Sequence, residues 1–278
     1  MLKKLFKYEW KSVSTLLLIV HGALLVYALI GRIGYQIYFS KFLSDSSNTV
    51  MGITTMFYVV VYVFGIMAVL LMTMLYLAIH IQKSFFSDEG YLTHTLPVSP
   101  TQLLLSKIFI YWVWTILDLI FVAASIAILL VNKETWPAIV YGFREMWHTL
   151  TSLSGLSDIL NNIVYLLSLC IEFFIFSTGL LIFAVCLGSQ FKTHKVMGSV
   201  LSFFGIIILC NIVDLIITSI TLPGGFGTVM MITRAGERVT NYSYIIETLW
   251  YLAAGIFFFF GSRYILSKRL NLEYNKDI

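Results

Sequence analysis

Three acidic residues lie inside apolar stretches of the sequence, where charged side chains are unexpected. Asp118, Glu172 and Asp214 are each flanked on both sides by hydrophobic residues. A carboxylate at the centre of a bilayer costs about 2.5–3.5 kcal/mol on insertion scales, so such groups usually face a protein interior or a water-filled path. We therefore treat the three acids as candidates for a substrate or proton path. The alternatives are a protonated carboxyl bonded to a neighbouring helix and a contact across a subunit interface.

Other polar side chains share a face with these acids at helical spacing. Three of them, Asn161, Tyr165 and Ser168, fall within about 60° of one another and of Glu172, at about 100° per residue, and a shorter stripe surrounds Asp214. No lysine or arginine lies at the same depth, so we expect the acids to be protonated, to face water or to meet a cation from outside the chain. The path candidates are Asp118, Asn161, Tyr165, Ser168, Glu172, Asn211 and Asp214.

Motifs of known enzymes are missing from the sequence. It contains no G-x-x-x-x-G-K-[ST] phosphate-binding loop, no H-E-x-x-H zinc motif and no G-x-S-x-G nucleophile elbow. The five histidines are scattered, and the three cysteines lie inside apolar runs. We therefore expect no catalytic residue, metal or cofactor in this chain.

The amino-acid composition indicates the class of protein in which these acids occur. Of the 278 residues, 59% are hydrophobic and 12% are charged, whereas soluble domains have about 45–50% and about 25%. These values exclude a soluble globular protein and a disordered chain. A polytopic membrane protein is the class that fits.

Windows without charge predict six transmembrane helices in one all-α transmembrane domain, residues 1–278. Strands are excluded because lipid offers no partner to an open strand edge. Each window is long enough to cross a hydrocarbon core of about 30 Å. The expected spans are about 14–33, 53–81, 108–131, 159–188, 198–220 and 244–262.

The distribution of basic residues predicts that both termini are cytoplasmic. With the N-terminus inside, the larger share of the 18 lysines and arginines falls on inside segments. Residues 2–13 are amphipathic, with lysines on one side and Leu2, Phe6 and Trp10 on the other, which predicts an interfacial helix. A simple juxtamembrane anchor is the alternative. The outside segment 132–157 is rich in aromatic residues and predicts a short helix on the outer surface, and 221–243 is a turn-rich outside loop.

The longest inside connection, residues 83–107, contains turn signals at Asp88 to Gly90 and prolines at 97 and 100. Ser99 could cap a short helix that starts at Pro100. Such a helix would provide a docking surface on the cytoplasmic side, and an ordinary loop is the alternative interpretation.

The same connection resembles a segment of the ABC-2 type permeases, the six-helix transmembrane subunits of ABC transporters. It is similar to the family's E-x-x-L…L-P-[VI]-S…K pattern through Glu89-Gly90-Tyr91-Leu92, Thr95-Leu96-Pro97-Val98-Ser99 and Gln102-Leu103-Leu104-Leu105-Ser106-Lys107. The resemblance implies a coupling segment that docks into a separate ABC ATPase subunit, where ATP and Mg²⁺ bind. It also implies a homo- or heterodimer of permeases. The coupling contacts that it implies are Glu89, Tyr91, Leu92, Leu96, Pro97 and Leu103.

These features predict a permease subunit of an ATP-driven exporter in a bacterial plasma membrane, with lipid and protein partners and no nucleic acid. An amphiphilic peptide or toxin is the preferred substrate class, because an aromatic-rich chain with buried acids suits a hydrophobic cationic cargo. Two alternatives stay open. One is a proton-coupled secondary transporter in which Asp118 and Glu172 relay protons, and the other is a membrane sensor or assembly subunit that transports nothing.

Overall fold

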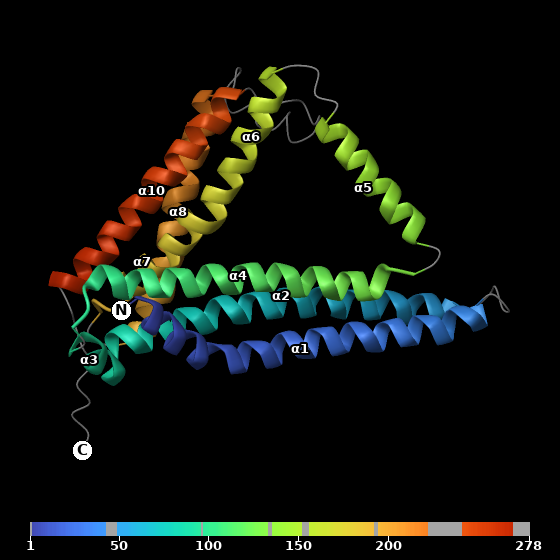
Figure 1. Ribbon diagram of the computed structural model, residues 1–278, viewed down its shortest axis with the longest axis horizontal. Helices are drawn as coiled ribbons and strands as arrows, with labels where there is room; N and C mark the ends of the chain where they lie inside the picture. Colours follow the sequence, from blue (N-terminus) through green and yellow to red (C-terminus); the bar gives the residue numbers. More distant parts are fainter. Residues whose placement is uncertain are drawn as a thin grey trace. The chain divides into compact units, whose positions relative to one another are not determined.

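The computed structural model describes residues 2–42, 49–95, 97–132, 135–151, 156–191, 194–221 and 241–268, and every regular element within these ranges is helical (Figure 1). This confirms the predicted all-α class. The elements are α1 (Leu2–Phe42), α2 (Thr49–Phe86), α3 (Asp88–Thr95), α4 (Pro100–Leu130), α5 (Trp136–Thr151), α6 (Leu156–Cys170), the π-helix η1 (Ile171–Phe176), α7 (Ser177–Gly188), α8 (Lys195–Thr221) and α10 (Asn241–Lys268).

Six helical segments of the described residues are long and apolar enough to cross a membrane, as predicted. They are Leu2–Gly34, Gly52–Phe86, Pro100–Leu130, Ile163–Gly188, Lys195–Ile220 and Ile245–Lys268. The fourth segment combines α6, η1 and α7. The cytoplasmic location of the termini stays a prediction, and the expected outside loop 221–243 falls almost entirely outside the described residues.

Two prolines stand in the first turns of helices, where a missing backbone N–H is tolerated. Pro100 is the first residue of α4, and Pro137 is the second residue of α5. Ser99 caps α4, since its hydroxyl accepts a hydrogen bond from the Gln102 N–H at 3.4 Å. The short helix expected after Ser99 is instead the beginning of α4, because no breaker interrupts the sequence before Leu130.

The stretch 2–13, expected to form a separate interfacial helix, is the first part of the continuous helix α1. The apolar side of this stretch packs against other residues of the protein. Trp10 stacks on Trp114 of α4, with ring centroids 5.2 Å apart, and Phe6 and Trp10 pack against the buried residues Val13 and Leu17.

Contacts within the chain divide it into two compact units. The α1–α2–α4 unit comprises Lys3–Leu77 and Phe109–Ser152, and also contains α5. The α6–α10 unit comprises Ala78–Ile108 and Leu153–Ile278, with Met1–Leu2. It includes α3, the end of α2 and the beginning of α4. Because α2 and α4 each continue from one unit into the other, both helices link the units covalently.

Helices α1, α2 and α4 lie side by side in their unit (Figure 1). Lipid tails are as apolar as these helices, so close packing and interhelical hydrogen bonds hold them together. Tyr62 of α2 and Ser125 of α4 share a hydrogen bond of 2.8 Å. Arg32 of α1 donates to the Ile128 and Val131 carbonyls, each at 2.6 Å, and so satisfies carbonyl groups at the end of α4 that lack helical partners.

The close approach of α1 and α2 also requires a small residue at their contact. The Tyr58 ring of α2 lies directly over Gly31 of α1, where a Cβ would overlap the phenol hydroxyl. This ring stacks on Tyr27 with centroids 5.0 Å apart, and its hydroxyl donates to the Tyr27 carbonyl at 2.9 Å. Glycine at position 31 therefore lets α1 and α2 meet through an aromatic contact.

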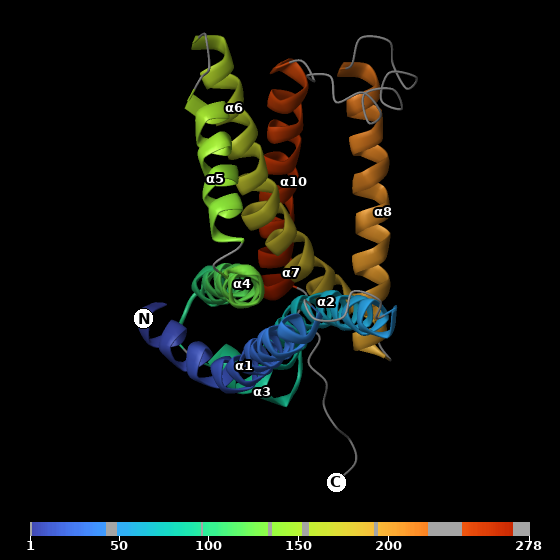
Figure 2. The same cartoon turned by 90° about the vertical axis from the view of Figure 1, so that its right-hand side faces the viewer.

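In the α6–α10 unit, α10 contacts α6, η1, α7 and α8, and α7 contacts α8 (Figure 2). The buried core of these helices contains Leu180, Ala254 and Phe258. Gly188 meets Ser199 of α8 so closely that a Cβ would overlap the Ser199 backbone. Of these helices, α10 contacts the π-helical part of the fourth span, and α8 packs on α7, which follows it.

Candidate functional site

Three acidic side chains from three different spans approach one another in the α6–α10 unit. Glu172 belongs to η1, Asp214 to α8 and Glu247 to α10. Glu172 and Asp214 interact electrostatically, and Glu247 interacts with both. Tyr251 lies one helical turn after Glu247 and donates its hydroxyl to Asp214 Oδ1 at 3.3 Å. We call these four residues the acidic site.

The backbone at Glu172 is π-helical. The Ser177 N–H donates to the Glu172 carbonyl, five positions earlier, instead of the usual four. The Ser177 hydroxyl bonds the Phe173 carbonyl. Single π-helical turns inside α-helices are rare and occur frequently at functional sites. The apolar run around Glu172 predicts a regular α-helix, and the structure differs from that prediction by this change in register.

The electrostatics of the acidic site suit a proton or a cation. The side chain of Glu172 is exposed within the isolated chain, and Asp214 and Glu247 are partly buried. In the part of the chain that the structure describes, none of the three forms an ion pair with a lysine or arginine. Ionised carboxylates this close repel one another, and protons or a positively charged ligand relieve the repulsion.

Two of the remaining path candidates, Ser168 and Asn211, form hydrogen bonds within their own helices. Ser168 is buried and donates to the Tyr165 carbonyl, while Asn211 is exposed and donates to the Ile207 carbonyl. Both bonds lie within one helix. The side chain of Tyr165 is 42% exposed, and that of Asn161 lies outside the described residues.

Asp118, the third acid singled out from the sequence, has different partners in the α1–α2–α4 unit. Its Oδ1 lies 2.6 Å from His21 Nε2 of α1 and accepts a hydrogen bond of 3.2 Å from the Thr73 hydroxyl of α2. His21 is fully buried, and Asp118 is 7% exposed. The prediction from the sequence took only lysine and arginine as basic partners, so His21 was not expected beside Asp118.

The hydrogen bonds determine how many protons this pair holds. His21 Nδ1 lies 2.7 Å from the Leu17 carbonyl, which can only accept, so Nδ1 carries a hydrogen. The bond between Nε2 and Asp118 needs one more proton, on either the ring or the carboxyl. In both arrangements the pair has no net charge, which reduces the cost of placing it among apolar side chains. The geometry supports a structural link between α1, α2 and α4.

The position of His21 on the buried face of α1 was predictable from the sequence. The buried positions of α1 are Val13, Leu17, His21, Leu24 and Ala28, and their spacing of three and four residues defines the inner face of a helix. A histidine on that face needs a buried partner. Tyr251 was similarly detectable, because it follows Glu247 by four positions and so shares its face.

The segment 83–107, which resembles the ABC-2 pattern, contains the helix α3. Tyr91 and Leu92 of α3 are 65% and 69% exposed, and Glu89 is also exposed. Pro97, between α3 and α4, is exposed as well, and Leu96 lies outside the described residues. Leu103 is only 4% exposed. It packs inside the chain and is therefore unsuitable as a contact for a partner protein.

Phe85, at the end of α2, holds α3 and α4 together. Its fully buried ring lies 6.4 Å from the His94 ring of α3, and Lys107 Nζ of α4 lies 5.5 Å from its centroid. Lys107 also donates to His80 Nε2 at 3.5 Å. Burial lowers the pKa of His94, although a hydrogen bond to the Phe85 backbone opposes this effect. The buried Nε2 of His94 has no hydrogen-bond partner among the described residues.

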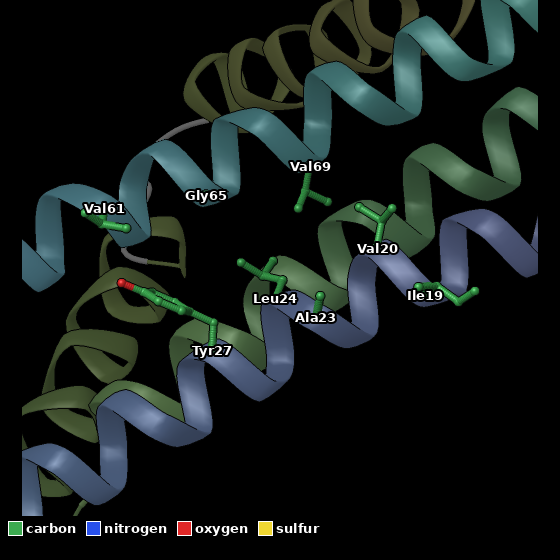
Figure 3. A pocket seen from close by; sticks show the side chains of 8 residues that line it. All are labelled: Ile19, Val20, Ala23, Leu24, Tyr27, Val61, Gly65 and Val69. Atoms are coloured by element: carbon green, nitrogen blue, oxygen red, sulfur yellow. The ribbon is translucent and has the colours of Figure 1, made fainter.

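An apolar groove of about 370 Å³ runs between α1 and α2 (Figure 3). Gly65 and Ala23 face it with little or no side chain, which leaves the space open. Its other lining residues are Ile19, Val20, Leu24, Tyr27, Val61 and Val69. The groove contains no charged side chain, so it does not extend the acidic site chemically.

Comparisons with models of protein families, with curated proteins and with solved structures found no match for this chain.

Proposed function

We propose that this chain is the permease subunit of an ATP-driven exporter of the ABC-2 type. It acts as a dimer with separate ATPase subunits in a bacterial plasma membrane, with both termini in the cytoplasm. The observation that carries the proposal is α3, a short helix between two long spans that exposes Tyr91 and Leu92 within the segment similar to the family's coupling region. The six candidate spans support a transport role.

The hydrogen bonds and side-chain contacts that join α3 to α2 and α4 could transmit a movement of α3 to these two spans. Only Ser87 separates α3 from α2, and its hydroxyl and N–H both bond the Lys83 carbonyl, at 2.5 and 3.3 Å. The Gly90 N–H donates to the Ser87 carbonyl at 2.8 Å. A displacement of α3 by an ATPase would therefore move the end of α2 directly. Through Phe85 and Lys107 it would also move the beginning of α4.

The test introduces a charge on the exposed face of α3. In the complex purified with its native ATPase, Leu92→Asp is expected to reduce cargo-stimulated ATP hydrolysis at least tenfold, because a carboxylate cannot pack in an apolar contact. Leu92→Met is the matched control and should retain stimulation. Both variants should insert and elute like the wild type, since Leu92 is 69% exposed. Normal stimulation of a well-folded Leu92→Asp complex, or purification of a functional transporter without any ATPase, would refute the proposal.

The acidic site supports an amphiphilic cargo with a positive charge, such as a cationic peptide or toxin. Its carboxyls lie within spans rich in phenylalanine, and Phe176 and Tyr251 pack with ring centroids 5.1 Å apart. Such a site offers apolar contact and negative charge together. Glu172→Gln preserves size and hydrogen bonding, so it should weaken stimulation by cationic peptides while neutral peptides of equal hydrophobicity act almost normally.

A proton-coupled secondary transporter is the second candidate, and the acidic site favours it too. Three carboxyls from three spans with a bonded tyrosine could exchange protons during a transport cycle. The two functions separate in liposomes prepared with this chain alone and with the chain plus its ATPase. Uptake by the chain alone that is driven by a pH gradient and lost in Glu172→Gln would favour the secondary transporter. Transport that occurs only with the ATPase and ATP would favour the exporter.

A further inference from the structure

Helix α5 carries an apolar stripe on its surface. Trp136, Val140, Phe143 and Trp147 follow one another at intervals of four, three and four residues and fall within about 60° around the helix axis. Their side chains are 54%, 46%, 66% and 67% exposed. Arg144, Glu145 and His148 lie about 80–180° away from Trp136 around the axis. The helix is therefore amphipathic, with its charged and titratable residues on one side.

Covalent geometry keeps α5 near the membrane surface. Residues 131–135 connect it to α4, and residues 152–155 connect it to α6. The longer link reaches at most about 18 Å, at about 3.6 Å per residue. Because α4 is a candidate membrane span that ends at Leu130, the beginning of α5 lies within that reach of a span. The end of α5 is joined through residues 152–162 to the next candidate span, which begins at Ile163. This constraint holds for any placement of the two units.

The size of the stripe argues for lipid rather than a second protein. A stable protein interface buries roughly 800 Å² on each partner. The stripe has three aromatic side chains, which would bury about 150–250 Å² each if fully exposed. At the exposures above, they offer roughly 300–450 Å². Tryptophan at both ends of the stripe is also typical of the membrane interface.

We propose that α5 is an interfacial helix that binds the lipid headgroup layer. Trp136, Val140, Phe143 and Trp147 insert toward the acyl chains, and the side with Tyr141 and Glu145 faces water. The helix thereby anchors the connection between the third and fourth spans at the bilayer surface. This assignment is independent of the ATPase and of the cargo.

Spin labels on opposite sides of α5 test the proposal in the full chain. Native Cys170, Cys186 and Cys210 are first replaced, and the protein is reconstituted in vesicles of phosphatidylethanolamine and phosphatidylglycerol. Labels at Val140→Cys and Phe143→Cys should collide several-fold more often with oxygen, which concentrates in lipid, than with a water-soluble nickel chelate. Labels at Tyr141→Cys and Glu145→Cys are the matched controls and should show the reverse preference.

Two results would overturn the interfacial assignment. Equal access of the nickel chelate to all four positions would place α5 in water. Protection of positions 140 and 143 from both reagents would show that protein covers the stripe. Because two positions represent each side, failure of one variant to fold still leaves a complete comparison.

Discussion

At the residue scale, Asp118 fits one of the alternatives that the sequence left open, a carboxyl bonded to a neighbouring helix. In the structure it bonds His21 and Thr73 from two neighbouring helices. A shared proton allows this pair to be buried without net charge. The acidic site differs in kind, because its carboxyls interact electrostatically with one another and one of them accepts a hydrogen bond from a tyrosine.

Substitutions at Asp118 should therefore affect stability according to hydrogen bonding rather than charge. An asparagine can donate its amide N–H to neutral His21, so Asp118→Asn should keep the free energy of unfolding within about 1 kcal/mol of wild type. Asp118→Ala leaves the buried His21 Nε2 without a hydrogen-bond partner and should lower the free energy of unfolding by about 1–3 kcal/mol. Unfolding in mixed detergent micelles measures both values. Equal destabilisation by the two variants would show that the negative charge itself matters.

At the element scale, α3 is joined to α2 through one buried aromatic ring. His94 contacts that ring, and Lys107 of α4 lies above it. An imidazolium at position 94 would place a second positive charge near Lys107 and would have to be desolvated. The contact therefore favours neutral His94.

This contact predicts that α3 loosens in acid. Burial holds the pKa of His94 below its ordinary value of 6.5. At pH above 6.5 the ring is neutral whether α3 is docked or released. As the pH falls from 6.5 toward the lowered pKa, the released state binds a proton more readily, so docking weakens. Hydrogen exchange of the α3 amides should accelerate between pH 7.5 and 5.5.

The control for this effect is His94→Asn, which can keep a hydrogen bond to the Phe85 carbonyl but does not titrate. Its α3 amides should exchange with no pH dependence beyond that of the intrinsic chemical rate. The same acid-induced acceleration in wild type and His94→Asn would assign the effect to another group, such as His80.

At the scale of the whole molecule, two compact units share two long helices. Helices α2 and α4 each pass from one unit into the other. The basic residues predict α3 inside and α5 outside.

Surface labelling tests this orientation directly. In a cysteine-free background, Tyr141→Cys on α5 should react with an impermeant maleimide on whole cells, because the side chain is 64% exposed and is predicted to lie outside. Thr95→Cys at the end of α3 should react only after the cells are opened. The opposite pattern would reverse the topology and move the proposed ATPase contact to the wrong side.

The sequence alone determined the class of the protein and the number of its spans. Hydropathy is a local property, and a long apolar run between charged segments has one stable solution in lipid, a helix. The cap at Ser99 was also readable, since it depends on neighbours three residues apart.

Only the tertiary structure decided which polar groups meet. Asp118 lies 97 positions from His21, and Asp214 lies 37 positions from Tyr251. The burial of Leu103, the exposure of Leu92 and the π-helical turn at Glu172 likewise depend on packing. Helical periodicity identifies the face on which a residue lies, but the partner of that face follows from how side chains of different helices fit together.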